Sequence, residues 1–286
     1  MAKEFAAAIE TKFPRLWSAL TNGTCVNRTI VGDGAPVVPK TVEELQKYPQ
    51  FKHTHYHYDH GHDHNMTVKH TVKQGTTLSG QVETLLKVNS TLANHSNVIS
   101  KLILDGRNKD IAACDEHYKE FFNNPLTEGG EPRGFKQYEA LQALNPTRFC
   151  GRDKFFDSQA YLLPVLVGMY KNLMYDTDHG ATAIGMLRSS CDPEFNFQFM
   201  YCSRFFRSSA VCNLRFQGRD LSKNAVIEAY KNWQKDIEEI KSNFANMLAQ
   251  AKTLSKNNYK IAGQCWIAAP HVWYSAVNDN GQFEGR

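Results

Sequence analysis

Residues 222–256 read SKNAVIEAYKNWQKDIEEIKSNFANMLAQAKTLSK and carry the most regular apolar repeat of the 286-residue chain. Apolar side chains recur at alternating steps of four and three residues, the heptad spacing of one face of a long helix. This repeat is called the C-terminal seam below, and its members are Val226, Tyr230, Trp233, Ile237, Ile240, Phe244, Met247, Ala251 and Leu254. Because Ser222 is a favoured N-cap residue directly ahead of the repeat, the sequence predicts one helix over about 222–256.

A second repeat of the same kind lies in the first half of the chain. Its members are Leu78, Val82, Leu85, Asn89, Leu92, Ser96, Ile99 and Ile103. The spacing predicts a helix over about 78–104, which ends at Asp105-Gly106. A long helix with one apolar face needs a partner of similar length, so we expect the two helices to pack as an intramolecular bundle. An oligomeric coiled coil is the alternative.

Strict alternation of another kind occupies Phe195 to Phe205, where every second residue is aromatic apart from Ser203. Period two is the pattern of a β-strand with one apolar face. Together with Ala210 to Phe216, across a short Arg-Ser-Ser turn, it predicts a small aromatic β-hairpin at about 194–217. The predicted fold class is therefore mainly α, a bundle built on two long heptad-patterned helices with this hairpin attached.

The chain divides naturally at its least regular stretches. Residues 1–77 hold an N-terminal helix, loops and a histidine-rich segment, and residues 78–286 hold the helical bundle with the hairpin. Glycines and prolines gather between residues 125 and 134, which makes this stretch the clearest candidate for a linker. We expect the two parts to form one compact domain, because 286 residues can share a single core.

Composition narrows the class of protein. Hydrophobic residues make up 42% of the chain and aromatic residues 12%, which is typical of a globular protein with a well-packed core. The net charge of +4 arises from 33 basic and 29 acidic residues, without a long run of like charges. Such a balance does not support nucleic acid as a partner.

The first residues lack the basic and continuously apolar regions of a signal peptide, and the longest apolar run is too short to span a bilayer. Seven cysteines at irregular spacing form no disulfide or metal pattern. The sequence therefore predicts a soluble protein of the cytoplasm with buried, reduced thiols.

Residues 53–64 read HTHYHYDHGHDH and have a composition that folding alone does not explain. Imidazole is the commonest protein ligand for transition metals, and six imidazoles with two carboxylates in twelve residues predict affinity for zinc or a similar divalent ion. The candidate ligands are His53, His55, His57, Asp59, His60, His62 and His64. If the segment is a strand, His53, His55 and His57 share one side of it, where a metal can tie the segment to the bundle or join two copies of the protein.

Thr54 to His60 also resembles the T-H-x-H-x-D-H signature of the metallo-β-lactamase superfamily, over these seven residues alone. The resemblance implies a dinuclear metal-dependent hydrolase. His55 and His57 would hold one metal, Asp59 and His60 the second, and a bridging water would be activated as hydroxide. Asp59 would be the residue on which catalysis depends.

The surroundings of this motif favour a non-enzymatic role. The family places its motif after a buried apolar strand, whereas the residues before Thr54 are polar and interrupted by Pro49. We therefore expect a metal-binding helical protein that acts in assembly or partner binding, through its long helices or its histidine-rich segment. The metal-dependent hydrolase is the main alternative. Lesser alternatives are a helical pore-forming protein with the hairpin as its apolar tongue, and a nucleic-acid-coating protein in which the aromatic stripe stacks bases with Arg204, Arg207 and Arg215 nearby for the phosphates.

Overall fold

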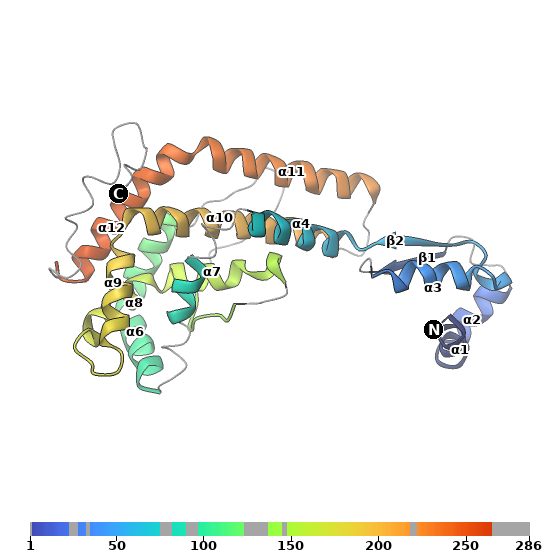
Figure 1. Ribbon diagram of the computed structural model, residues 1–286, viewed down its shortest axis with the longest axis horizontal. Helices are drawn as coiled ribbons and strands as arrows, with labels where there is room; N and C mark the ends of the chain where they lie inside the picture. Colours follow the sequence, from blue (N-terminus) through green and yellow to red (C-terminus); the bar gives the residue numbers. More distant parts are fainter. Residues whose placement is uncertain are drawn as a thin grey trace. The chain divides into compact units, whose positions relative to one another are not determined.

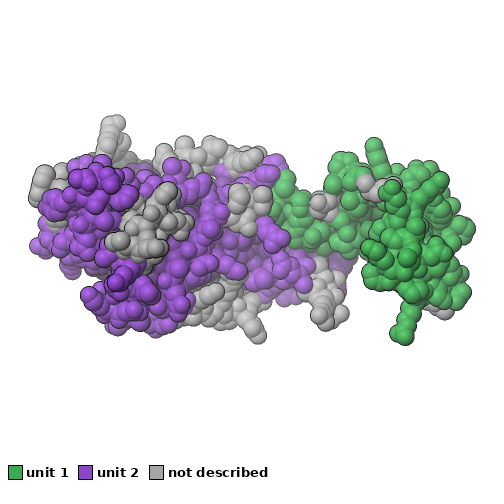
Figure 2. Space-filling view, turned by 90° about the horizontal axis from the view of Figure 1, so that it is seen from below, with its two compact units in different colours: residues 1–67 green, residues 68–286 purple. Residues whose placement is uncertain are grey.

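The computed structural model is mainly α-helical, with one small parallel sheet (Figure 1). It describes residues 2–22, 28–32, 35–74, 82–89, 97–122, 137–144, 148–217 and 222–264. These divide into two compact units, one of residues 1–67 and one of residues 68–286 (Figure 2). The predicted linker at 125–134 lies outside the described residues.

Unit 1 combines short helices with two strands. Its elements are α1 (Ala2–Lys12), α2 (Pro14–Thr21), β1 (Arg28–Gly32), α3 (Val37–Leu45), the 3-10 helix η1 (Pro49–Phe51), β2 (Thr54–Tyr58) and the first half of α4 (His60–Gln74). Its core gathers Ala6, Leu20, Leu45 and Phe51, with Trp17 and Ile30 packed against them. The predicted N-terminal helix is two helices. Pro14 is the first residue of α2, and because proline has no backbone N–H it cannot continue the hydrogen bonding of α1.

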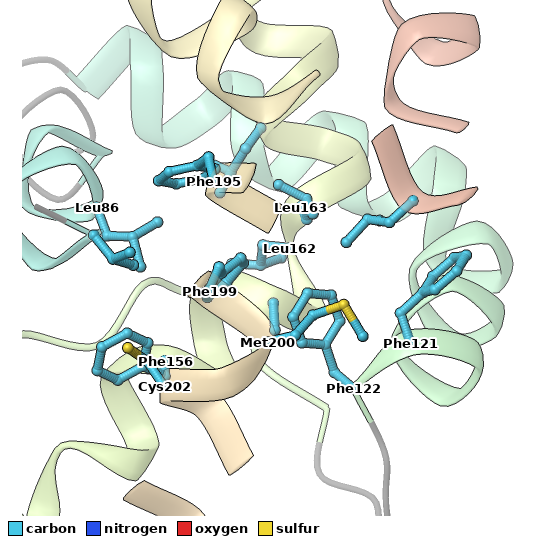
Figure 3. Close-up of a cluster of buried hydrophobic side chains, with 14 of the residues drawn as sticks. Leu86, Phe121, Phe122, Phe156, Leu162, Leu163, Phe195, Phe199, Met200 and Cys202 are labelled. Atoms are coloured by element: carbon cyan, nitrogen blue, oxygen red, sulfur yellow. The ribbon is translucent and has the colours of Figure 1, made fainter. Parts of the chain in front are cut away.

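The regular elements described in unit 2 are all helices, and its described residues 137–144 form neither a helix nor a strand. Residues 82–89 form a helix, and the named elements are α6 (Asn97–Phe121), η2 (Phe149–Gly151), α7 (Asp153–Tyr161), α8 (Leu163–Leu173), α9 (Gly180–Ser190), α10 (Pro193–Phe216), α11 (Lys223–Ser242) and α12 (Phe244–Ile261). Helix α10 lies at its centre, in contact with α7, α9, α11 and α12. Figure 3 shows Phe199 and Met200 of α10 among Phe122, Phe156 and Leu162.

The predicted aromatic hairpin at 194–217 is wrong, because residues 194–216 belong to the single helix α10 and Gln217 is its C-cap. Alternation indicates a strand only where one side is exposed, and α10 is buried around most of its circumference. Two of the polar residues between its aromatic ones, Asn196 and Arg204, are buried as well. The side chain of Asn196, for example, donates to the carbonyl of Ser190 at 2.8 Å and to the hydroxyl of Ser255 at 2.7 Å.

The C-terminal seam faces the core except at Phe244, which is 43% exposed, and it does not lie on one continuous helix. Ile240, Met247 and Leu254 are buried, as the heptad spacing predicts. Asn243, however, ends α11 and begins α12, so the helix predicted over 222–256 is two helices. Ser222 caps α11 by accepting the backbone N–H of Ala225 at 3.2 Å.

The predicted intramolecular packing of 78–104 along 222–256 is not confirmed, because residues 78–81 and 90–96 lie outside the described part of the chain and the helix that contacts both α11 and α12 is α10. The predicted end at residue 105 is also wrong, because α6 continues through Gly106 and changes its backbone angles only at Asp110. Gly106 has a packing reason. A Cβ atom at this position would lie 3.0 Å from the side chain of Val165, so glycine allows α6 to approach α8 closely.

Candidate functional site

The two strands of unit 1 set the geometry of the histidine-rich segment. They pair in parallel, with Thr29 beside His55 and Val31 beside His57. Neighbouring residues in such a register point to the same side of the sheet. The sheet therefore has an inner face, with Ile30 beside Tyr56, and an outer face, formed by Thr29, Val31, His55 and His57.

The inner face is packed against the rest of unit 1. Ile30 contacts the core cluster of the unit, and Thr54 is buried. The hydroxyl of Tyr56 donates to the carbonyl of Gly32 at 3.2 Å. A Cβ atom on Gly32 would lie 2.7 Å from Val38, so only glycine fits where α3 approaches the sheet. These contacts settle which side of each strand faces inward.

The outer face is uncovered in the part of the chain that the structure describes. Val31 is 62% exposed, and both His55 and His57 are exposed. Alternate residues of a strand lie about 6.6 Å apart along its axis, so the two imidazoles are neighbours on one surface. The structure thus brings together two of the seven predicted ligands, on a side of the sheet where they have no packing role.

The other predicted ligands are placed differently. His53 is exposed in the turn before β2, and His60 and His62 are partly exposed in the first turn of α4. His64 is fully buried in α4. Among the described residues, no three His, Cys, Asp or Glu side chains are gathered in a group that could hold a metal ion.

Asp59 forms the start of α4. Its Oδ1 atom accepts the backbone N–H of Gly61 at 2.8 Å and that of His62 at 3.3 Å. The backbone N–H of Asp59 itself donates to the carbonyl of Gly32 at 2.9 Å, which extends the pairing of the strands by one residue. Asp59 is therefore an N-cap at the junction of β2 and α4, with a structural reason to be an aspartate.

Helix α10 carries a network of buried polar side chains that is not among the site residues predicted from the sequence. Nη2 of Arg207 donates to Oδ1 of Asp157 at 2.7 Å, and Nη1 donates to the carbonyl of Phe122 at 2.7 Å. One turn earlier, Arg204 is 4% exposed and donates to the side-chain oxygen of Gln250 at 3.0 Å. Burial and then the nearby Arg207 lower the pKa of Arg204. Both guanidinium groups thus connect α10 to its neighbours.

The burial of side chains on α10 weakens the alternative in which the protein coats nucleic acid. Phe195, Phe197, Phe199 and Phe205 are at most 8% exposed, so the aromatic stripe belongs to the core. Two of the residues predicted to bind phosphate, Arg204 and Arg207, are buried with it, and the third, Arg215, is partly exposed. The signal that the sequence offered was Asp192-Pro193, an N-cap followed by a first-turn proline that indicates the start of a helix.

None of the described helices is long and apolar enough to cross a membrane. No family model matches this chain, and neither a curated protein nor a solved structure matches it.

Proposed function

We propose that this protein binds a divalent transition metal, zinc before others, through His55 and His57, and uses it in assembly or partner binding. The observation that carries this proposal is the position of the two imidazoles, side by side on the exposed outer face of the sheet. Their ring nitrogens can converge on one ion, because Zn–N bonds of about 2.0–2.1 Å need only small side-chain rotations from neighbouring positions on a strand.

The chemistry of the pair supports zinc. Neutral imidazole is a good ligand for Zn, Cu and Ni, whereas Mg and Ca prefer oxygen. An exposed strand position also needs no desolvation of the ligands before the metal arrives. His53 and His62 lie on either side of the pair in sequence and can raise the local concentration of metal without occupying the same face.

A catalytic role has less support. A dinuclear hydrolase needs Asp59 and His60 to hold a second metal, but Oδ1 of Asp59 is engaged by two backbone N–H groups of α4. The hydrolase alternative expects two equivalents of tightly bound zinc and hydrolytic activity that is lost in Asp59→Ala. The assembly role expects neither.

The test is zinc titration by calorimetry, after dialysis of the full chain against a chelator. We expect saturable binding, and its loss in the double variant His55→Ala/His57→Ala. The matched control is His53→Ala/His62→Ala, which removes the same number of imidazoles from the same segment and should retain binding. Equal loss in the two double variants would overturn the proposal, because it would mean diffuse attraction by the whole segment.

A further inference from the structure

We infer that the zinc ion held by His55 and His57 is shared with a second copy of this chain, so that one ion joins the outer faces of two sheets. This inference rests on the proposed function. It adds the identity of the partner, the stoichiometry and the surface by which the two chains meet.

The first step is the number of ligands. Structural zinc sites are almost always four-coordinate, with all four ligands supplied by protein. The outer face supplies two, and no third described His, Cys, Asp or Glu side chain joins them to complete a group. A two-fold axis through the metal brings the same two histidines from a second chain and completes the tetrahedron. Such an interface is self-complementary, as in most symmetric dimers.

The second step is the character of the sheet. Parallel sheets are normally covered on both faces, because their strands carry apolar residues on each side. In unit 1, within the described residues, packing covers the face of Ile30 and leaves that of Val31 exposed. Val31 lies beside His57 in the register, so it would be among the first residues that a second sheet covers.

The third step is charge. Across a two-fold axis, the residues closest to the axis lie near their own equivalents, so a formal charge beside the shared metal would be repelled by its copy. The outer face consists of Thr29, Val31, His55 and His57, and none of them is charged when the imidazoles are neutral, as metal binding requires. The face is therefore compatible with a second copy of itself.

The area of contact then explains why the dimer should depend on metal. Stable interfaces bury about 800 Å² per partner, far more than four side chains of a two-stranded sheet provide. Without zinc the sheets have too little contact to stay together, and the metal supplies the main attraction. The assembly is thus expected to respond to the concentration of zinc.

The experiment is sedimentation velocity of the full chain, first in chelator and then at increasing zinc. We expect monomer in chelator and a doubled mass that is complete at about half an equivalent of zinc per chain, as one ion for two chains requires. A large excess of zinc should return the protein to monomer, because each histidine pair then holds its own ion. The double variant His53→Ala/His62→Ala should behave like the natural chain.

Val31→Lys separates the dimer from the metal site, because an ammonium group is charged but is not a zinc ligand. The variant should retain zinc, measured by calorimetry, but bind one ion per chain and stay monomeric, because two ammonium groups would repel each other where the two outer faces meet. Saturable zinc binding by the natural chain without any change in mass would overturn the shared site and leave the proposed function standing. Absence of zinc binding would overturn both, and a dimer that persists in chelator would overturn the metal bridge.

Discussion

Oδ1 of Asp59 accepts the backbone N–H of Gly61 at 2.8 Å and so caps helix α4. This contact joins the strand that carries His55 and His57 to the helix that follows it. The aspartate of the hydrolase-like motif therefore has a folding role, while the two histidines before it do not.

Replacement of Asp59 by alanine should lower the free energy of unfolding by about 1 kcal/mol, the usual cost of a lost N-cap. Asp59→Asn should retain most of the stability, because asparagine caps about equally well. Urea denaturation followed by circular dichroism measures both. Zinc binding at His55 and His57 should be unchanged in both variants. If Asp59→Ala folds but no longer binds zinc, the result would instead favour the hydrolase.

Acid should destabilise unit 2 through His117. Burial lowers the pKa of His117 to about 4, from 6.5. Among the described residues its Nε2 atom has no hydrogen-bond partner, and its ring lies 5.2 Å from that of Phe121. The unfolded state binds the proton more readily, so the stability that His117 contributes is complete above pH 6.5 and is lost as the pH falls towards 4.

The measurement is the free energy of unfolding at pH 7.5 and pH 5. His117 should account for a loss of about 2 kcal/mol between these values. His117→Phe keeps an aromatic ring against Phe121 and cannot be protonated, so the variant should lose less stability by about that amount. If the free energy of unfolding falls by the same amount in the natural chain and in His117→Phe, another group is responsible.

The pair of Arg207 and Asp157 should tolerate joint replacement better than single replacement. Both side chains are buried, and their atoms Nη2 and Oδ1 lie 2.7 Å apart. Asp157→Ala leaves a buried guanidinium without its counter-ion, which should cost about 3–5 kcal/mol. Arg207→Met/Asp157→Leu should cost less than either single change, and a double-mutant cycle measures the coupling. Additive costs would contradict the importance of the ion pair.

Two glycines of α9 should respond to alanine in opposite directions. A Cβ atom on Gly180 would lie 2.9 Å from the carbonyl oxygen of Met174, whereas one on Gly185 meets nothing within 4 Å. Gly180→Ala should therefore destabilise the protein by about 1–3 kcal/mol. Gly185→Ala should stabilise it by about 0.5–1 kcal/mol, because alanine is the better helix former. Thermal unfolding of the two variants tests this contrast.

Part of the site was open to sequence reasoning. The alternation of histidines left a loop or a strand open, with alternate histidines on one side if it is a strand, and β2 places His55 and His57 together on its exposed face. The sequence does not predict that His53 lies outside the strand or that His64 is buried, because these depend on where α4 begins and what packs on it. The capping role of Asp59 has a local signal, since aspartate before a helix is a favoured N-cap.

By itself, the sequence determined that the chain is mainly helical and that the C-terminal seam faces a core, because a heptad repeat leaves one apolar side to bury. Only the tertiary structure decided the partner of that seam and the nature of α10. A fully buried helix can carry aromatic residues on every side, so the period of its sequence no longer distinguishes it from a strand. Its buried Asn196, Arg204 and Arg207 each donate a hydrogen bond to a residue distant in sequence, which no local pattern reveals.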